Sequence, residues 1–270
     1  RRGAAALMQV CGLHIYPVKS CAGLSVPRMQ LDRFGPSGDR RWLVVVGKDA
    51  VFLSQRELPR LALITVQPTA TGLRLSCGGE SVVSAVPDTA ERVAVTVWED
   101  TVSAIDCGDV VAQWLCEQLG RSARLVYMPD DSERLVDTDY AHAGETVSFA
   151  DGFPLLLISQ ESLQELNRRL PSAVPMNRFR PNLVISGCEP HAEDSWRQIR
   201  VGEVIFDIAK PCARCTVPSI DQGSAAKDPD ILRVLSSYRR GDDRQIYFGQ
   251  NLLYRGAGEV ALGDPVEILA

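Results

Sequence analysis

Two cysteines separated by two residues form the segment of this sequence with the most specific chemistry. Cys212 and Cys215 enclose Arg214 and follow an apolar run over residues 204–209. This spacing suits a redox disulfide, half of a zinc site, or one metal-bound thiolate beside a structural cysteine. No second cysteine pair has suitable spacing for a four-ligand zinc site, and the three histidines are isolated. Buried structural cysteines remain the simplest alternative, since a free thiol packs as a small hydrophobe.

Two other segments offer cations that could bind an anionic group. Lys19 and Ser20 stand at the start of a loop of small residues, where an ammonium, a hydroxyl and backbone N–H groups can face one anion. A solvated loop lysine is the alternative. Arg40 and Arg41 precede the apolar run 42–46. Because side chains alternate along a strand, at most one of these two arginines can face inward.

Arg178 and Arg180 form a second basic pair, next to Pro181. The proline disfavours helix at Arg180, so the pair is expected in extended chain with both side chains on one face. Arginine binds phosphate through a planar fork, which makes the pair a candidate phosphate clamp. Two surface arginines flanking Phe179 are the alternative.

Acidic residues near these segments are candidates for a catalytic role. Glu193 and Asp194 precede Trp196, and we expect a turn in which the tryptophan anchors the loop while the acids are solvated. Asp221 follows the cysteines in a stretch rich in turn residues. It is either a proton donor or a turn residue, and the turn is favoured.

Short strands must position these groups. Alternating apolar and polar residues, separated by turn residues, predict many strands. The expected strands cover residues 13–16, 42–46, 62–66, 73–77, 93–98, 102–105, 125–128, 155–159, 183–186, 204–209, 246–254 and 259–269. Consecutive strands without intervening helices favour antiparallel barrels, so the fold class is mainly β with a few helices, of the α+β kind.

Three segments have helical spacing instead. Residues 109–119 are followed by Gly120, a C-terminal stop. Ser159 can cap a helix that runs to Leu170. Asp228 caps a third helix, with Pro229 at its first position. We place a division near residues 129–140, which gives domains over residues 8–130 and 131–270.

Composition narrows the class of protein. The chain has 270 residues, 45% of them hydrophobic, and a net charge of −5, which argues against a general nucleic-acid binder. No apolar run is long enough to span a bilayer. Eight cysteines in so long a chain favour free thiols in a reducing compartment. No cysteine cluster has plant-type iron–sulfur spacing, so an electron-transfer centre would belong to another chain.

Six segments in order resemble one family. They are 16–21 (YPVKSC), 39–44 (DRRWLV), 178–188 (RFRPNLVISGC), 192–196 (AEDSW), 212–215 (CARC) and 248–251 (FGQN). Together they resemble the MOSC superfamily, in particular the amidoxime reducing components and their bacterial relatives. The likeness extends over nearly the whole chain, from about residue 8 to residue 269.

The resemblance implies an N-terminal β-rich domain, a MOSC-type β-barrel domain and a molybdenum cofactor, Mo-molybdopterin. Position by position, it makes Cys215 the metal ligand and catalytic residue, while Cys212 is not a ligand. It places the cofactor-binding positions at Lys19, Ser20, Arg40, Arg180, Arg214 and Asn251. At Gly152 and Phe153, where relatives carry small hydroxyl residues, it implies backbone contacts only.

The expected activity is reduction of small N-hydroxylated compounds (amidoximes, hydroxylamines, N-hydroxylated bases) to amines or amidines. A separate iron–sulfur, flavin or haem protein would supply the electrons. One rival is a molybdenum cofactor carrier or sulfur-transfer module without turnover, and another is a thiol-redox protein that uses Cys212 and Cys215. A bacterial protein of this kind would be cytoplasmic, and a eukaryotic one would sit at the mitochondrial outer membrane through an anchor.

Overall fold

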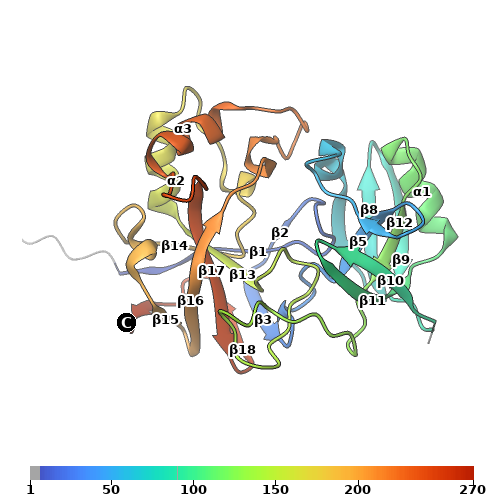
Figure 1. The fold of residues 1–270 in the computed structure, drawn as a ribbon, viewed down its shortest axis with the longest axis horizontal. Coiled ribbons are helices and arrows are strands. Elements are labelled where there is room, and N and C mark those ends of the chain that lie inside the picture. Colours follow the sequence, from blue (N-terminus) through green and yellow to red (C-terminus); the bar gives the residue numbers. More distant parts are fainter. Residues whose placement is uncertain (1–6, 90) are drawn as a thin grey trace, which may run out of the picture.

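Strands dominate the computed structural model, which describes residues 7–89 and 91–270. Three α-helices accompany them, so the mainly β fold with a few helices is confirmed. Two lobes lie side by side in Figure 1: a barrel with α1, and a larger sheet with α2 and α3. In the described part of the chain, no helix is both long and apolar enough to cross a membrane.

The smaller lobe is built on a closed five-stranded barrel. Its order is β10-β11-β12-β5-β6, and a parallel pairing of β6 with β10 closes it. A three-stranded sheet, β7-β8-β9, and the helix α1 complete this lobe. The barrel strands are β5 (Trp42–Val46), β6 (Val51–Phe52), β10 (Val93–Val97), β11 (Asp100–Asp106) and β12 (Arg124–Tyr127). The other elements are η1 (Pro59–Leu63), β7 (Thr65–Pro68), β8 (Gly72–Cys77), β9 (Glu80–Ala85) and α1 (Asp109–Leu119).

The larger lobe is built on an eight-stranded sheet in the order β19-β15-β16-β17-β13-β14-β1-β2. A small sheet, β18-β3-β4, joins the start of the chain to its end. The first-half strands here are β1 (Gln9–Ile15), β2 (Leu24–Ser25), β3 (Arg28–Asp32) and β4 (Gly35–Pro36). The second half supplies β13 (Leu155–Ser159), β14 (Leu183–Ser186), β15 (Gln198–Val201), β16 (Val204–Ala213), β17 (Tyr247–Arg255), β18 (Gly258–Ala261) and β19 (Val266–Ile268).

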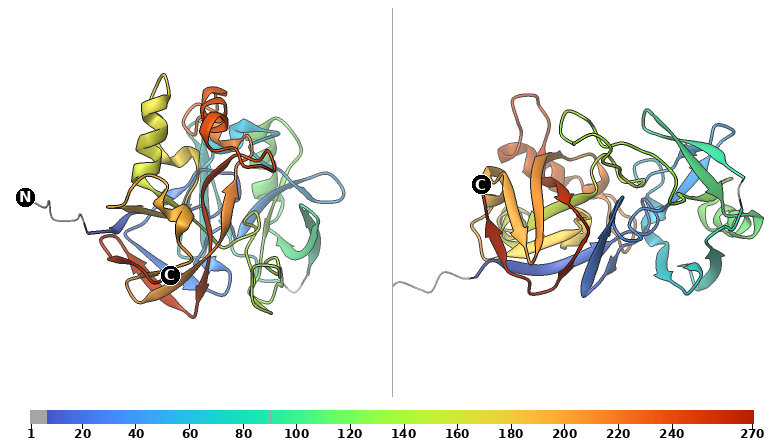
Figure 2. Two further views of the ribbon diagram at one scale, coloured as in Figure 1. Left: turned by 60° about the vertical axis from the view of Figure 1, so that its left-hand side comes forward. Right: turned by 90° about the horizontal axis from the view of Figure 1, so that it is seen from below.

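The first strands of the chain therefore do not belong to the lobe formed by the residues that directly follow them. β1 pairs with β14 in the eight-stranded sheet and β3 pairs with β18 in the small sheet, so residues 9–32 contribute to the larger lobe. Figure 2 shows β1 running along that sheet before the chain enters the barrel. The division into residues 8–130 and 131–270 stays a prediction about domains, and these pairings show that strands cross it.

Local capping explains the helix boundaries. α1 ends at Gly120, whose φ of 69° closes the left-handed C-cap, as expected. α2 (Gln160–Arg169) begins after Ser159, whose side chain accepts the Ser162 N–H. α3 (Asp230–Tyr238) begins one residue later than expected, and the Asp228 carboxylate accepts the Asp230 N–H. Three short 3-10 turns are η2 (Met176–Arg178), η3 (Ala192–Ser195) and η4 (Val217–Ser219).

Most expected strands are present, with two corrections. The predicted strand 62–66 is wrong at its start, because Pro59 opens the 3-10 turn η1 and the strand β7 begins at Thr65. The predicted strand 259–269 is two strands, β18 and β19, separated by a turn at Gly263 with φ 85°. The strands β3, β9 and β15 and the two-residue strands β2, β4 and β6 were not predicted.

Candidate functional site

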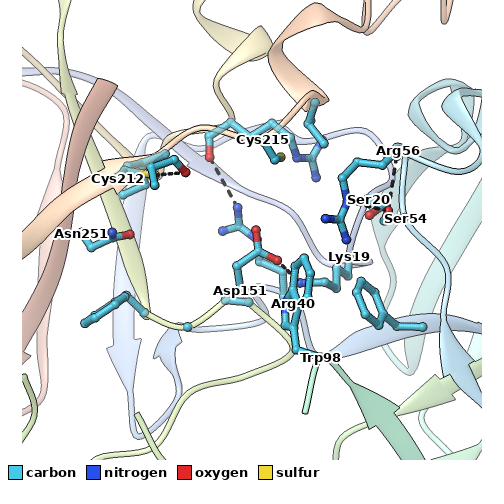
Figure 3. Close-up of a pocket in the computed structure, with 18 of the residues that line it drawn as sticks. Lys19, Ser20, Arg40, Ser54, Arg56, Trp98, Asp151, Cys212, Cys215 and Asn251 are labelled. Carbon is cyan, nitrogen blue, oxygen red and sulfur yellow. Dashed lines mark hydrogen bonds and ion pairs between the residues drawn. The ribbon is translucent and has the colours of Figure 1, made fainter. Parts of the chain in front are cut away.

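A single large cavity brings together the chemistry-bearing residues of both halves of the chain. Its volume is about 1100 Å³, at the upper end of the range for ligand sites. Every residue that the resemblance selected lines it: Lys19, Ser20, Arg40, Arg180, Arg214, Cys215 and Asn251. Figure 3 shows several of them facing the cavity from opposite walls. The structure places them together, while their roles remain predictions.

The two cysteines differ in their surroundings. Cys215 lies just beyond the end of β16, and its thiol is free and exposed. Cys212 is half-buried and packs against the hydrophobic cluster under α2 and α3. Its sulfur accepts the Arg214 Nη1–H at 3.2 Å, while Arg214 Nη2 donates to the Phe179 carbonyl at 2.8 Å. Both thiols line the cavity, but Cys215 is the more exposed of the two and has no hydrogen bond to Arg214.

Tyr16 acts as a platform for two cavity arginines. The guanidinium carbon of Arg40 lies 4.4 Å from its ring centroid, and that of Arg180 lies 4.2 Å away. The Tyr16 hydroxyl donates to the Pro181 carbonyl at 2.9 Å, which fixes the ring. Cation–π attraction thus holds two like charges close together at the cavity wall.

Arg180 has unused hydrogen-bonding capacity. Its Nη1 donates to Gln222 at 3.2 Å, but among the described residues its buried Nη2 has no partner. Only 9% of the residue is exposed. Burial, with the Arg40 charge nearby, lowers the pKa of Arg180 to about 10, so the side chain stays cationic at neutral pH. A buried, charged donor without a partner is costly unless an anion accepts from it.

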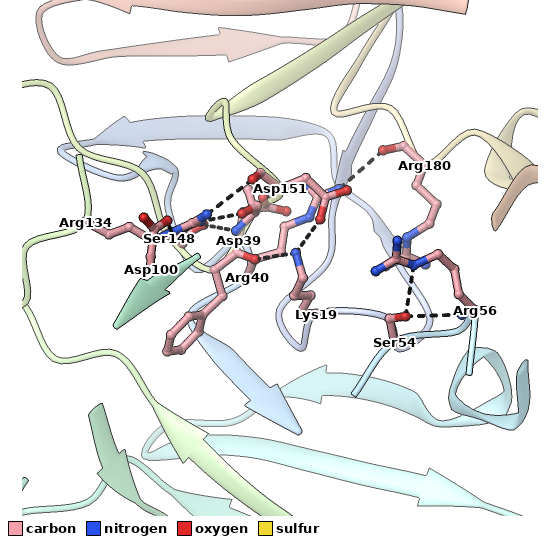
Figure 4. Close-up of polar contacts among 12 residues, drawn as sticks. Lys19, Asp39, Arg40, Ser54, Arg56, Asp100, Arg134, Ser148, Asp151 and Arg180 are labelled. Atoms are coloured by element: carbon pink, nitrogen blue, oxygen red, sulfur yellow. Dashed lines mark hydrogen bonds and ion pairs between the residues drawn. The ribbon is translucent and has the colours of Figure 1, made fainter. Parts of the chain in front are cut away.

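Lys19 is also buried, with 6% of its surface exposed. Its ammonium donates to the Phe149 carbonyl at 2.7 Å and to the Asp151 carboxylate at 2.6 Å (Figure 4). Burial lowers the pKa of Lys19, although Asp151 opposes that effect. Burial would raise the pKa of Asp151, but Lys19 outweighs it and holds that pKa well below its usual range.

Arg134 positions the loop that carries Asp151. Its guanidinium donates to the carbonyls of Ser148, Ala150 and Asp151, and its Nε donates to Asp100 at 2.7 Å. Since Asp100 begins β11, the loop from the second half is tied to the barrel of the first half (Figure 4).

A buried polar network joins the halves beneath the cavity. Asp39 accepts the Tyr16 N–H at 2.7 Å, the Arg40 Nη1–H at 2.6 Å and the Asn182 amide at 3.2 Å. Asn182 also accepts from Arg40 at 3.0 Å and donates to the His14 carbonyl. This network fixes Arg40 relative to the sheet, because each of its members is satisfied.

A second connection is a pair of amides. Gln55 from the first half and Gln222 from the second exchange hydrogen bonds at 3.0 and 2.9 Å. Gln55 also donates to the Ser20 carbonyl at 2.7 Å, so it fixes the loop that holds Ser20.

Strained backbone is concentrated around the cavity. In the described part of the chain, eight non-glycine residues have positive φ, and four of them line the cavity. These four are Ser20 (68°), Arg40 (49°), Trp98 (57°) and Arg180 (56°). Such conformations cost of order 1–3 kcal/mol each and cluster at functional sites.

Other residues from the sequence analysis lie elsewhere. Arg41 faces away from the cavity and donates to the Met128 carbonyl and to Asp130, as expected for one of an alternating pair. The prediction that Arg178 and Arg180 form a phosphate clamp in extended chain is wrong. Residues 176–178 form the turn η2, which directs Arg178 to Asp221 at 3.0 Å, outside the residues that line the cavity.

The acids near the site also differ in their placement. Asp221 accepts from the N–H groups of Gly223 and Ser224, so it is the turn residue that was favoured. The expectation that the acids before Trp196 are solvated is wrong for Glu193. This residue is 1% exposed and accepts hydrogen bonds from Ser159 and Ser162 at the start of α2.

Among the cavity residues missed from the sequence are Asp151, Arg134, Arg56 and Trp98. Arg56 and Trp98 are stacked, with the guanidinium carbon 4.3 Å from the ring centroid. Nothing in the spacing of these residues marks them, because they reach the cavity from loops that are far apart in the sequence or, for Arg134 and Asp151, from one long connection without regular structure.

Known protein families and individual relatives match most of this chain. A family model described as the MOSC N-terminal beta barrel domain matches residues 7–122, and one described as the MOSC domain matches residues 144–267. The "Mitochondrial amidoxime-reducing component 1" of Mus musculus is 34% identical, covering 96% of this chain and 82% of that protein. The Homo sapiens protein of the same name is 31% identical, with the same coverage.

A second group of relatives is longer. The "Molybdenum cofactor sulfurase" of Drosophila grimshawi is 32% identical over 97% of this chain, which spans 34% of that protein. Relatives with two different names, amidoxime-reducing component and molybdenum cofactor sulfurase, therefore align with nearly the whole chain.

Proposed function

This chain belongs to the MOSC family, and from that premise we propose that it is a molybdenum-cofactor-dependent reductase of N-hydroxylated compounds. The observation that carries the proposal is one cavity lined by an exposed thiol and seven cationic side chains. Relatives that are 31–34% identical and named amidoxime-reducing components support the activity. The substrate would be an amidoxime, a hydroxylamine or an N-hydroxylated base.

The residues present fit a phosphorylated, anionic metal cofactor. The unpartnered Nη2 of Arg180 and the buried Nε of Arg214, also without a partner among the described residues, are donors that a phosphate or an anionic metal centre can satisfy. Lys19, Ser20 and Arg40 would bind the same anion from the first half of the chain. Cys215 would supply a thiolate ligand, and Asn251 would place an amide beside it.

When bound, the molybdenum centre would supply the two-electron redox chemistry that cleaves an N–O bond. Reduction of an amidoxime takes up two electrons and two protons and releases water. The chain's own part is to hold the cofactor and to position the substrate. Lys19 holds the pKa of Asp151 well below its usual range, which disfavours it as a proton donor, and Asp221 lies outside the residues lining the cavity. Protons would come from water or from another acid at the cavity, and electrons from a separate iron–sulfur, flavin or haem protein.

The test uses protein purified from a host that makes the cofactor. Elemental analysis measures molybdenum per chain, and benzamidoxime with an artificial electron donor measures turnover. We expect about one molybdenum per chain and formation of benzamidine. Absence of molybdenum, together with a reducible bond between Cys212 and Cys215, would favour a thiol-redox protein instead.

A variant pair tests the assignment of the metal ligand. Cys215→Ala is expected to reduce turnover to background, while Cys212→Ala retains about half or more, because Cys212 packs as a small hydrophobe. Molybdenum content and circular dichroism of both variants separate loss of metal from loss of fold. Equal losses in the two variants would contradict a single cysteine ligand.

The second candidate function is a cofactor carrier or sulfur-transfer module. The alignment of 97% of this chain with a molybdenum cofactor sulfurase favours it. It would use the same cavity and carry a persulfide on Cys215. Full molybdenum loading without turnover of benzamidoxime would support this function over the reductase.

A further inference from the structure

Exposed apolar side chains lie on the cavity beside its charged groups. Val51 is 41% exposed, Trp98 42% and Leu135 56%, and all three line the cavity. Val51 and Trp98 come from the barrel, and Leu135 comes from the segment that follows it. Exposed apolar side chains clustered beside a cavity mark a surface that binds an apolar group.

The backbone of Trp98 is strained. The register of β10 with β11 pairs Val97 with Asp100, so Trp98 and Glu99 form a two-residue hairpin loop. Trp98 has φ 57°, in the left-handed region. Hairpin loops of this length favour Gly, Asn or Asp at such positions, because a bulky side chain is disfavoured there. A strained tryptophan at a loop tip points to a function for the side chain itself.

Neighbouring side chains hold the indole in one orientation. The Phe52 ring centroid lies 5.0 Å from that of Trp98, and the Arg56 guanidinium lies 4.3 Å from it. Ser54 accepts the Arg56 Nε–H at 3.3 Å, which fixes the arginine in turn. Figure 3 shows Trp98 and Cys215 across the cavity from each other. An aromatic ring fixed in this way can bind another ring at little cost in conformational entropy.

We propose that Trp98 stacks on a planar ring of the substrate, so that the site selects aromatic N-hydroxylated compounds over small aliphatic ones. The proposal rests on the reductase function and names its substrate class. Two of the arginines that would hold the cofactor, Arg40 and Arg180, lie on the Tyr16 ring, whereas Trp98 packs against Phe52 and Arg56. Lys19 borders this apolar group, with its ammonium 5.6 Å from the Phe52 ring centroid, so the substrate ring would bind next to the cofactor.

The main experiment compares benzamidoxime with acetamidoxime, which share the N–O bond and differ in the ring. In Trp98→Ala, the ratio of kcat/KM for the aromatic to the aliphatic substrate is expected to fall about tenfold, through KM. Trp98→Phe, which keeps a ring, should change that ratio less than about threefold. Val110→Ala, at an exposed position on α1 outside the cavity residues, is the control. An unchanged ratio in Trp98→Ala overturns the proposal.

Two further measurements separate this proposal from its alternatives. Loss of molybdenum or pterin from Trp98→Ala would make the tryptophan a cofactor contact and overturn the proposal. Calorimetric titration with benzamidine and acetamidine measures ring binding without turnover. If the wild-type holoprotein reduces neither substrate, the reductase function fails, yet benzamidine should still bind about tenfold more weakly to Trp98→Ala. Absence of benzamidine binding to the wild type would overturn the ring site as well.

Discussion

Asp151 and Lys19 form an ion pair at the predicted anion site. The Lys19 side chain is 7% exposed and that of Asp151 is 73% exposed, so the lysine is fixed while the carboxylate faces the cavity. A phosphate that binds Lys19 competes with this carboxylate, which is ionised at neutral pH. If Lys19 binds the predicted anion, Asp151 would act as an internal competitor for that site.

Replacing Asp151 should reveal this competition. Asp151→Asn keeps the shape but removes the charge, and it should raise the affinity of the cofactor-free protein for inorganic pyrophosphate about three- to tenfold. Isothermal titration at constant ionic strength measures the affinity. Asp131→Asn is the matched control, because Asp131 is exposed and paired with Arg92. If both variants bind pyrophosphate as the wild type does, Asp151 does not compete for the site.

At this scale, a site residue could be predicted only where the sequence around it carries a recognisable pattern. Cys215 and Lys19 stand in segments that resemble a family, and the structure places both on one cavity. The conformations of Arg40 and Arg180 gave no such signal, since arginine has no preference for positive φ. The local sequence therefore predicted an extended pair of arginines, whereas the chain turns at residues 176–178 and separates them.

At the scale of elements, the turn η3 shows how one short segment supports a helix. It places Glu193 where the carboxylate accepts hydrogen bonds from Ser159 and Ser162, at the N-terminus of α2. A negative charge there also interacts favourably with the helix dipole. His191 precedes η3 with φ 61°, and its N–H donates to the Ser162 hydroxyl at 2.8 Å.

His191 makes the stability of this region depend on pH. Its ring lies within 6 Å of Tyr238 and Phe248, and burial, together with the Arg239 charge, lowers the pKa of His191 to about 4. The unfolded chain takes up a proton near pH 6.5, but the folded chain does not, so this contribution to stability is lost as the pH falls from about 6.5 towards 4.

A urea-unfolding experiment checks this sign. Between pH 7 and pH 5, the wild type should lose about 1 kcal/mol more unfolding free energy than His191→Asn, after allowance for partial exposure of the ring. Asparagine tolerates positive φ, so the variant removes the titrating group without adding backbone strain. Equal losses in the two proteins would show that His191 does not titrate differently in the folded state.

A helix or strand could be predicted where its own residues show both the apolar pattern and the boundaries, and could not where that pattern is missing. The helix α1 has the predicted bounds because its apolar spacing and Gly120 are both local. The strand β9 was missed because most of its residues are exposed, which leaves no apolar alternation to detect. β3 does alternate, with Met29 and Leu31 buried, so its sequence carried a signal that could have found it.

At the scale of the whole molecule, long-range pairing decides which residues form each lobe. β1 lies about 170 residues before its partner β14, and β3 lies about 230 residues before β18. No local pattern specifies such partners, which is why sequence reasoning divided the chain in two consecutive parts. The cavity depends on these pairings, because they place the loop with Lys19 and Ser20 beside the strands of the second half.

The pairings predict how fragments of the chain behave. Residues 131–270 lack four core residues of the larger lobe: Val10, Leu13, Met29 and Leu31, each no more than 4% exposed. Burial of one such side chain contributes about 1.5–3 kcal/mol, so losing four removes about 6–12 kcal/mol. This equals the whole stability of many domains, about 5–15 kcal/mol. The fragment 131–270 should therefore not unfold cooperatively in urea.

Residues 37–130 provide the comparison, since they contain all five strands of the closed barrel together with α1. This fragment keeps every strand pairing of the barrel but lacks the buried core residues Val18, Cys21, Phe34 and Phe149. It should therefore still unfold in a single transition, at a lower urea concentration than the intact protein. Tryptophan fluorescence follows both fragments, through Trp42, Trp98 and Trp114 in one and Trp196 in the other. A cooperative transition in residues 131–270 would contradict the view that β1 and β3 are essential to the larger lobe, and would make the division near residue 130 a folding boundary.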